Sequence, residues 1–572
     1  MLKKHRPRLL KLSLSVGMLL MLLLSACGGT TTTTTTSTTP TAGTPVKGGT
    51  WIDDLYEDTT SVIPNGSSQT YAYLLEQAIW APLFVGDPKG NINAGLASEV
   101  PSLANGDISP DLKTWTFKLR PNLVWSDGQP LNADDVNYTW KLWTGKSKFT
   151  PASTVGFNLI KSTDVSADKL SIIFHLSAGF EPFLSQWTDS GFAPMPAHIF
   201  SSIPDDQILK SAQNLKPTVS SGPFIMSESV HGDHYTVVRN PKYYLAAQGF
   251  PYLDKVVFRI VTNQDTILSD FQSGSITSSW FLDVTKTPVY RTLAGYHIAT
   301  NPINSNFEAL YFNLNNAALK DVNVRKAIAM AIDQPTLIAT ARFGQASPLC
   351  TNHSPAYHPG YQPNPPCPKF DIAAANALLT QAGWVQGADG VRTKGNLRLE
   401  FQYSTTANNS WRKADTLINQ ANFAKIGVKT DIQYYPASTF FGTILPGGKP
   451  GTYDMAEFEN NYGYDADDSS QFACNQIPSA ANSFGGGNWD WYCNPQADAL
   501  YKQEQSTADP TLRQQAFDQL HQIYLTDFPF VTLYAPTDLA VTKNNTYNYL
   551  PGPGSAAETV NIWTWWCTGG TC

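Results

Sequence analysis

The amino-terminal segment constrains this chain most, because it decides the compartment in which the rest must fold. The first eleven residues (MLKKHRPRLLK) carry five basic side chains and no acid, and Leu12 to Ser25 is apolar or small. A basic start followed by an apolar run and small residues is typical of an export signal. The run is shorter than the ~20 residues that a membrane-spanning helix needs. We therefore expect the remainder of the chain to fold outside the cytoplasm.

The end of this segment, LSAC at residues 24–27, resembles a bacterial lipobox. The resemblance implies that residues 1–26 are a lipoprotein signal peptide and that Cys27 becomes a lipidated amino terminus. The alternative is an ordinary secreted protein whose signal happens to end near a cysteine. Residues 27–46 are rich in threonine, and a low-complexity stretch of this kind cannot bury a core. We expect a tether here, with the folded part beginning near Lys47.

The composition is that of a large folded protein with an acidic balance. The chain has 572 residues, 42% of them apolar and 15% charged, which suits a sizeable core. Its length suggests roughly two to four lobes. Loss of the export segment lowers the 39 basic residues to 34 against 46 acids, so that the formal net charge falls from −7 to −12. Because phosphate binding needs a basic face, this charge argues against nucleic acid as a partner.

Seven cysteines occur, and six remain once Cys27 is assigned to the export segment. Outside the cytoplasm, an even set of cysteines indicates disulfides. A metal site is the alternative, but no CxxC occurs and no histidine lies at zinc-ligand spacing beside any of the six. Pairing of sequence neighbours favours Cys350–Cys367, Cys474–Cys493 and Cys567–Cys572.

The order of strand-like and helix-like segments predicts a mixed α/β fold. Residues 114–119 alternate with a period of two, which predicts a strand with one apolar face. Further strands are predicted at 170–176, 255–261, 397–403 and 428–434. Helices are predicted after the capping residues Asn132, Asp321 and Asp371, and from Thr511 to Thr526. Strands followed by helices throughout favour an α/β or α+β protein over a helical bundle or an all-β sandwich.

No catalytic motif accompanies this pattern. The chain lacks a GxSxG elbow, a Walker A loop, an HExxH pair and a GxGxxG loop. His231 and His234 have HxxH spacing, but they lie between two strand-like runs and fit a hairpin tip better than a metal site. The acids from Asp465 to Asp468 begin like a calcium loop, yet Ser470 and Gln476 stand where that loop needs glycine and glutamate. We therefore expect that the protein holds no metal and no cofactor, and that it is not an enzyme.

Aromatic residues are plentiful, with 15 tryptophans in a chain that is 12% aromatic. Most single tryptophans belong to a core, but a surplus in a chain without catalytic motifs can also line a ligand cleft.

Six sequence blocks, taken in order, resemble the family-5 extracellular solute-binding proteins, which are the dipeptide, oligopeptide and nickel receptors of ABC importers. The densest block is TWTFKLRPNLVWSDGQPLNADDV at 114–136. The others are PMPAH at 194–198, SGPF at 221–224, RNPKYY at 239–244, DVNVRKAI with AID at 321–333, and AGW with DG at 382–390. The resemblance extends from about Lys47 to the carboxyl terminus.

The resemblance implies a periplasmic-binding-protein-like class II architecture, in which two main lobes surround a hinged cleft and an extra domain is inserted. We expect the ligand between lobe I and lobe III, and hinge closure around it. Lobe I is expected at 47–91, 217–308 and 532–572, the inserted lobe II at 92–216, and lobe III at 309–531.

The function implied is that of a monomeric, lipid-anchored substrate-binding protein, which binds peptides and delivers them to the permease and ATPase of an ABC importer. The alternative is the same fold with an oligosaccharide or a chelated nickel ion as ligand. In family terms, Asp465 pairs with the α-amino group of a peptide, and the Cys474–Cys493 bridge holds its loop. Tyr464, Tyr403 and Asn482 are further candidate ligand contacts. The other interpretation of Asp465 is a solvated acid in a loop.

Overall fold

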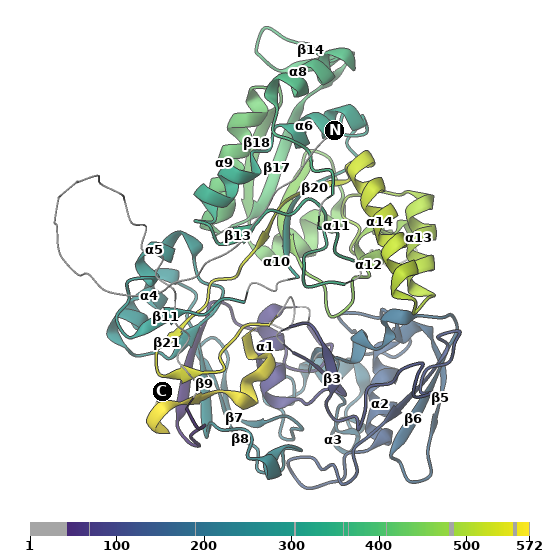
Figure 1. Ribbon diagram of the computed structural model, residues 1–572, viewed down its shortest axis with the longest axis vertical. Helices are drawn as coiled ribbons and strands as arrows, with labels where there is room; N and C mark the ends of the chain where they lie inside the picture. Colours follow the sequence, from purple (N-terminus) through teal and green to yellow (C-terminus); the bar gives the residue numbers. More distant parts are fainter. Residues whose placement is uncertain are drawn as a thin grey trace, which may run out of the picture. The chain divides into compact units, whose positions relative to one another are not determined.

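The computed structural model describes residues 43–572, apart from 68, 88, 189, 302–304, 359, 364, 408, 480–485, 553–557 and 571 (Figure 1). The signal peptide, Cys27, most of the tether and Asn482 lie outside the described residues. The chain from Ala42 to Cys572 forms one compact unit. None of its described helices is both long enough and apolar enough to cross a membrane.

The largest sheet has seven strands and is built around β1. In spatial order the strands are β11 (Tyr296–Ile298), β21 (Val541–Lys543), β10 (Ser278–Ser279), β1 (Thr50–Leu55), β9 (Lys255–Ile260), β8 (His234–Arg239) and β7 (Phe224–Val230). β1 runs parallel to β9 and β10, and the remaining pairs are antiparallel. Trp51 of β1 is fully buried, with its ring 4.7 Å from that of Trp565. The carboxyl-terminal segment thus packs on the first strand.

A second sheet has six strands and is centred on β12. Its order is β13 (Ala346–Ser347), β20 (Phe530–Pro536), β12 (Phe307–Phe312), β19 (Met455–Asn460), β17 (Glu400–Thr406) and β18 (Lys429–Tyr435). All six residues of β12 are buried, as expected for a strand covered on both faces. β17 is parallel to both of its neighbours, while β12 is antiparallel to β19 and β20.

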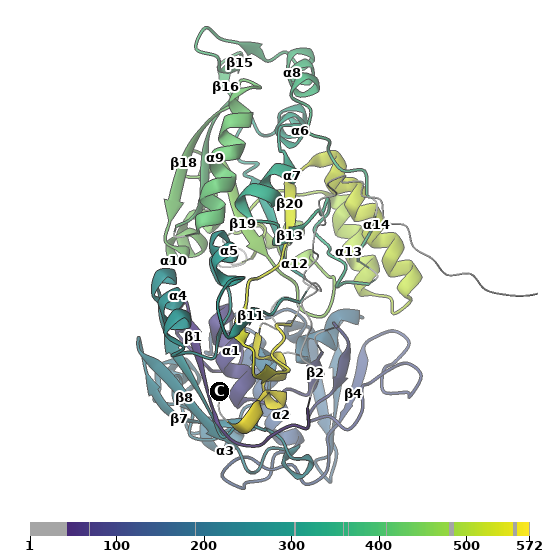
Figure 2. The same cartoon turned by 60° about the vertical axis from the view of Figure 1, so that its left-hand side comes forward.

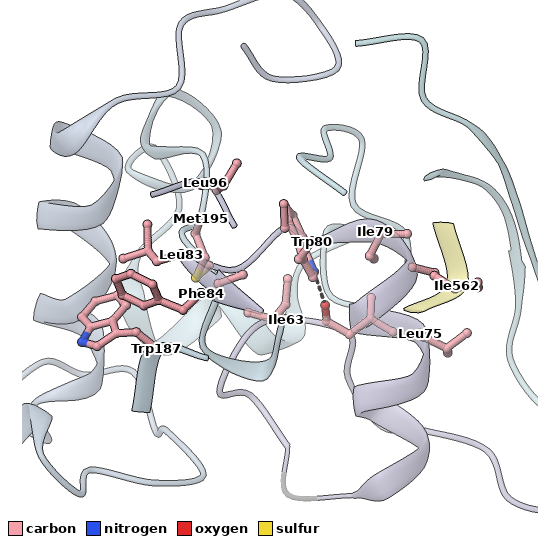
Figure 3. Packing of buried hydrophobic residues seen from close by; sticks show 14 of the residues in the cluster. Ile63, Leu75, Ile79, Trp80, Leu83, Phe84, Leu96, Trp187, Met195 and Ile562 are labelled. Atoms are coloured by element: carbon pink, nitrogen blue, oxygen red, sulfur yellow. Dashed lines mark hydrogen bonds between the residues drawn. The ribbon is translucent and has the colours of Figure 1, made fainter. Parts of the chain in front are cut away.

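A third sheet is formed by β4 (Thr114–Lys118), β6 (Ser171–Leu176) and β5 (Ile160–Val165), in that order. Phe117 and Phe174 on its inner face contact Phe183 and Trp187. Figure 3 shows Trp187 in the same apolar cluster as Phe84 and Trp80, whose indole donates to the Val62 carbonyl over 2.7 Å. Smaller sheets join β2 (Phe84–Gly86) to β3 (Ile92–Ala94), β14 (Val385–Gln386) to β15 (Arg392–Lys394) and β16 (Leu397–Arg398), and β22 (Thr546–Tyr547) to β23 (Trp566–Cys567).

Helices connect and cover these sheets. Figures 1 and 2 show α9 against β17 and β18, and α13 beside α14. The longer helices are α1 (Thr70–Ile79), α2 (Ala133–Trp143), α4 (Gln264–Ser273), α6 (Val322–Met330), α8 (Ile372–Gln381), α9 (Ser410–Ala424), α13 (Pro495–Gln505) and α14 (Pro510–Asp527). The shorter ones are α3 (Ala197–Phe200), α5 (Thr287–Tyr290), α7 (Gln334–Thr336), α10 (Ala437–Thr439), α11 (Leu445–Gly447) and α12 (Ser469–Phe472).

The predicted helix starts are confirmed by their caps. The Asn132 side chain accepts from the backbone of α2, and Asp135 closes a capping box with it. The side chains of Asp321 and Asp371 each accept a hydrogen bond from a backbone amide in the first turn of α6 and α8. Gly383, just after α8, has φ of +83°, as the end of a helix favours.

Two strand predictions have different outcomes. Residues 231–233 form the turn between the antiparallel strands β7 and β8, which confirms the hairpin predicted there. The single strand predicted at 397–403 is wrong, because the chain is divided at Leu399 between β16 and β17. The Leu399 amide donates back to Arg392 over 2.9 Å, so that β16 belongs to a separate small sheet.

The three predicted cysteine pairs have their sulfur atoms at disulfide distance. Their Cα atoms lie 5.2, 4.6 and 5.5 Å apart for Cys350/Cys367, Cys474/Cys493 and Cys567/Cys572. Nine tryptophans are almost fully buried, so most of the surplus belongs to the core. The lobe boundaries remain a prediction.

Candidate functional site

A cavity of about 380 Å³ lies where the loop between β19 and α12 meets α1 and a distant segment. The loop contributes residues from Asn461 to Gln471, including Tyr464 and Asp465. The opposite wall comes from Thr70 and Tyr73 of α1 together with Ser153, Val155, Pro182, Ser185, Gln186 and Phe192. Because these segments are far apart in sequence, the cavity exists only in the folded protein.

The loop is shaped by its own side chains. One oxygen of Asp465 accepts from the Asp467 amide, and one oxygen of Asp467 accepts from the Ser469 amide, each over 2.9 Å. Such local bonds from aspartate to the backbone are typical of turns. The Asp468 carboxylate accepts from Asn352 over 2.5 Å. The run of acids therefore builds the turn that leads into α12.

Arg513 of α14 is the cation that pairs with Asp465, although it does not itself line the cavity. It donates to both oxygens of Asp465, over 2.9 and 2.7 Å, in a bidentate pair. Its guanidinium also pairs with Glu181 at 2.6 Å and with Glu504 of α13 at 2.7 Å. Arg513 is only 5% exposed. One buried cation therefore serves three carboxyl groups from three parts of the chain.

The pKa values of these groups reflect the imbalance. Burial and the nearby Asp465 charge raise the pKa of Glu181 to about 8. Burial, followed by the charge of Asp467, raises the pKa of Glu504 well above its usual value. Burial opposes the charge of Asp465, but Arg513 outweighs it and keeps that pKa below its usual value. The cluster around Arg513 holds more acids than this single arginine neutralises, so it favours an additional proton or a cationic group.

Tyr464 is held at the cavity by contact with β2. A Cβ atom added to Gly86 would lie only 1.8 Å from the Tyr464 ring, so the ring rests directly on the Gly86 backbone. A side chain at residue 86 would displace the ring from the wall. The structure thus brings two of the predicted ligand residues, Tyr464 and Asp465, into one cavity.

Tyr403 lies elsewhere. It is fully buried on β17, where its hydroxyl donates to Glu457 and accepts from Asn419 over 3.2 Å. Its ring belongs to the apolar cluster beneath the six-stranded sheet, and it is not among the described residues that line the cavity with Asp465. The fourth candidate, Asn482, lies outside the described residues.

A pair of buried histidines supports the loop from behind. His353 Nδ1 lies 2.7 Å from His521 Nε2, and His353 Nε2 donates to the Ala466 carbonyl over 2.7 Å. Burial lowers the pKa of His353 to about 4 and that of His521 well below its usual value. Both imidazoles are therefore neutral at pH 7 and act as hydrogen-bonding supports.

Protonation of this pair is expected to destabilise the protein in acid. His353 takes up its proton near pH 6.5 in the unfolded chain and only near pH 4 in the folded chain, so the stability that depends on its neutral form is present above the first value and is lost as pH falls to the second. Over this range the wild type should lose about 2–3 kcal/mol more than His353→Gln. Denaturant unfolding at pH 7, 5.5 and 4 measures the difference. His198→Gln, which changes a partly exposed histidine, should follow the wild type; equal curves for all three proteins would contradict the assignment.

A second buried charge cluster lies between β12, β19 and α9. Arg412 of α9 donates to both oxygens of Glu308 on β12, over 2.8 and 3.2 Å, and to Thr406 over 2.7 Å. Burial raises the pKa values of Glu457 and Glu459 on β19 well above the usual range. The long central strands of the six-stranded sheet thus carry acids in their interior, which is unusual for a purely structural core.

Comparison with known proteins identifies the family. Residues 98–482 match the sequence profile of the bacterial extracellular solute-binding proteins, family 5, middle region. The chain belongs to this family. The resemblance inferred from the six sequence blocks is therefore confirmed.

Members of family 5 match this chain over most of its length. The oligopeptide-binding protein AppA of Bacillus subtilis (strain 168) is 26% identical over 543 residues, covering 92% of this chain and 93% of AppA. The nickel-binding periplasmic protein of Escherichia coli (strain K12) is 24% identical over 402 residues, covering 67% and 71%. The solved structure of Bacillus subtilis AppA with a nonapeptide superposes with a TM-score of 0.78 at 22% identity, covering 92% of this chain and 100% of the other. This likeness confirms the predicted mixed α/β, class II binding-protein fold.

Proposed function

We propose that this protein is the substrate-binding protein of an ABC importer and that it binds peptides and delivers them to a membrane permease. The observation that carries the proposal is the acid-rich cavity lined by Asp465 and Tyr464. Membership of a solute-binding family and similarity to AppA, a protein named for oligopeptide binding, support it.

The chemistry of the cavity suits a peptide ammonium group. Three carboxyl groups share Arg513, and one of them, Asp465, lines the cavity together with a further acid, Asp467. A ligand ammonium near Asp465 would balance this charge, as a proton does in the free protein. The volume of about 380 Å³ lies in the range of small-molecule sites.

Peptide binding is expected to stabilise the protein against heat. Ligand at a hundred times its dissociation constant should add about 2.7 kcal/mol to the free energy of unfolding. The change in melting temperature measures this stabilisation. It is recorded with di- and oligopeptides, with cello- and xylo-oligosaccharides, and with a nickel–histidine chelate. Shifts with peptides alone support the proposal; shifts with sugars or the chelate alone would replace it with the alternative ligand.

Substitution of Asp465 by asparagine distinguishes binding of the ligand ammonium group by Asp465 from a purely structural role in the loop. We expect Asp465→Asn to weaken peptides with a free amino terminus and to spare the same peptides when N-acetylated, because only the former carry an ammonium group. Calorimetric titration of both peptide forms measures the ratio. Asp389→Asn, at an exposed turn, serves as the control. Equal loss for both peptide forms would show that Asp465 only shapes the loop.

We further propose that Cys27 is lipidated after cleavage at residue 26, that residues 27–46 tether the protein to the outer face of the membrane, and that it acts as a monomer. The sequence of the export segment supports the anchor. The sulfur-to-sulfur proximity supports oxidation of the three cysteine pairs in that compartment. Mass spectrometry of the mature amino terminus tests the lipid.

A further inference from the structure

The Glu181 carboxyl group lies against the guanidinium of Arg513 without accepting a hydrogen bond from it. Its Oε2 atom is 2.6 Å from Arg513 Nη1, which is well within ion-pair distance. This oxygen atom is itself buried and has no hydrogen-bond partner in the described part of the chain. A donor and an acceptor can lie this close without a bond when the N–H bonds point elsewhere. The donors of Arg513 are therefore directed at other oxygens.

Two other acids receive the N–H groups of Arg513. Nη1 donates to Asp465 Oδ2 over 2.9 Å, and Nη2 donates to Asp465 Oδ1 over 2.7 Å. Nε and Nη2 donate to Glu504 Oε2 over 3.2 and 2.7 Å. Nη1 thus lies within reach of both Asp465 and Glu181, but only Asp465 accepts a hydrogen bond from it.

Glu181 is the neutral member of this group and Asp465 is the charged one. Burial, followed by the charge of Asp465, raises the pKa of Glu181 to about 8, so Glu181 carries a proton at pH 7. Arg513 keeps the pKa of Asp465 below its usual value, and the neutral Glu181 also favours the charged form of Asp465. A carboxylate has about four acceptor sites, and Arg513 with the Asp467 amide fills three of those on Asp465. One site remains for a further donor.

The other charged groups around Glu181 leave this balance negative. Asp467 of the loop also raises the pKa of Glu181, while burial raises the pKa of Asp467 itself and that of Glu504 on α13. Among the described residues, Arg513 of α14 is the cation within ion-pair distance of Glu181. A second positive charge beside Asp465 would therefore favour loss of the Glu181 proton.

We propose that a peptide ammonium group bound at Asp465 displaces the proton of Glu181 to solvent, and that Arg513 Nη1 then donates to Glu181. The ammonium group brings a positive charge and its own N–H donors, which replace those that Asp465 loses. The only covalent bond that breaks is the O–H bond of Glu181; its electron pair stays on the oxygen, and the proton goes to water. The new carboxylate forms a charged pair with Arg513, which joins the turn η2 (Glu181–Phe183) to α14.

This inference rests on the proposed function for its ligand, a peptide with a free amino terminus. The choice of Glu181 rests on its buried oxygen beside a nitrogen that donates to another acid. Glu181 is therefore a positioning residue, because it acts on the ligand through Arg513 and Asp465.

Calorimetric titration at pH 7 in two buffers of different ionisation enthalpy counts the protons released on binding. The wild type should release up to about one proton per peptide. Glu181→Gln, which resembles the neutral carboxyl group in shape but cannot ionise, should release none. A peptide amino group has a pKa of roughly 7.7–8.0 and takes up a small fraction of a proton with either protein, so the difference between the two proteins is the measure.

Matched controls identify the source of the proton. Glu504→Gln, which changes the other glutamate that pairs with Arg513, should still release it, and N-acetylated peptides should release none from any of these proteins. Wild-type affinity should rise by up to about tenfold from pH 6 to pH 7, while that of Glu181→Gln stays nearly constant. Ligand-free Glu181→Gln should melt with the wild type at pH 6, where both side chains are neutral; Glu181→Ala replaces it in the titrations if it does not fold.

The outcomes separate this inference from the proposed function. If peptides bind the wild type without proton release, or release the same proton from Glu181→Gln, the inference fails while peptide binding stands. Release that depends on Glu504 instead of Glu181 also overturns it. If no peptide binds, both fail, because no ligand ammonium group then reaches Asp465. Release from the wild type and from Glu504→Gln, but not from Glu181→Gln, supports both.

Discussion

Replacement of Arg513 by glutamine is expected to lower the free energy of unfolding by about 3–5 kcal/mol. The side chain is 5% exposed and is the cation shared by Asp465, Glu181 and Glu504. Without the guanidinium, the three carboxyl groups lie together without a cation, and each must be protonated or remain an unpaired charge. Because Arg513 joins Asp465 of the loop to Glu181, the residue before the cavity-lining Pro182, the same change should also loosen the contact between these two segments.

Chemical denaturation at pH 7 measures the loss. The matched control is Arg398→Gln, because Arg398 also pairs with two acids but is 44% exposed; its loss should be far smaller, because solvent screens an exposed pair. Since protonation relieves the acids, the loss for Arg513→Gln should shrink at pH 5. A loss as small as the control at pH 7 would contradict the buried-cluster account.

Replacement of Arg412 by methionine is expected to cost about 3–5 kcal/mol as well, because it leaves Glu308 buried without its partner. Burial opposes the charge of Arg412, but Glu308 outweighs it and raises the arginine pKa. The pair connects α9 to the central strand β12. The double variant Glu308→Leu with Arg412→Met removes both charges, so it should recover most of the loss.

A double-mutant cycle of the two single variants and the double variant measures this coupling. The exposed pair of Lys429 and Glu400, at 2.6 Å, provides the control cycle, for which little or no coupling is expected. Additive losses at Glu308 and Arg412 would show that the pair is not the reason for either loss.

Local chemistry made much of the fold predictable from the sequence. Helix caps such as Asn132, Asp321 and Asp371 act within one turn, so a reader of the sequence can locate them. The hairpin at residues 231–233 and the proximity of the cysteine pairs also depend on short separations. The split at Leu399 is also local, since β15 and β16 form a hairpin across Gly395 and Asn396, but the prediction followed the apolar pattern and overlooked this turn.

The candidate site was predicted only in part, because its residues come from distant parts of the chain. Asp465 and Tyr464 were found through the resemblance, but Arg513 and Glu181 are far from each other in sequence and carry no motif that joins them. Tyr403 was selected as a ligand contact, yet its place on a strand with both faces covered turns its hydroxyl toward Glu457.

Titration of the purified protein with defined peptides, followed by recovery of the peptide, tests the central claim most directly. The account predicts saturable heat with one peptide per protein and return of the peptide intact, since the protein holds its ligand without reacting with it. Absence of saturable binding to any peptide, while a sugar or a nickel chelate saturates the same protein, would contradict the claim.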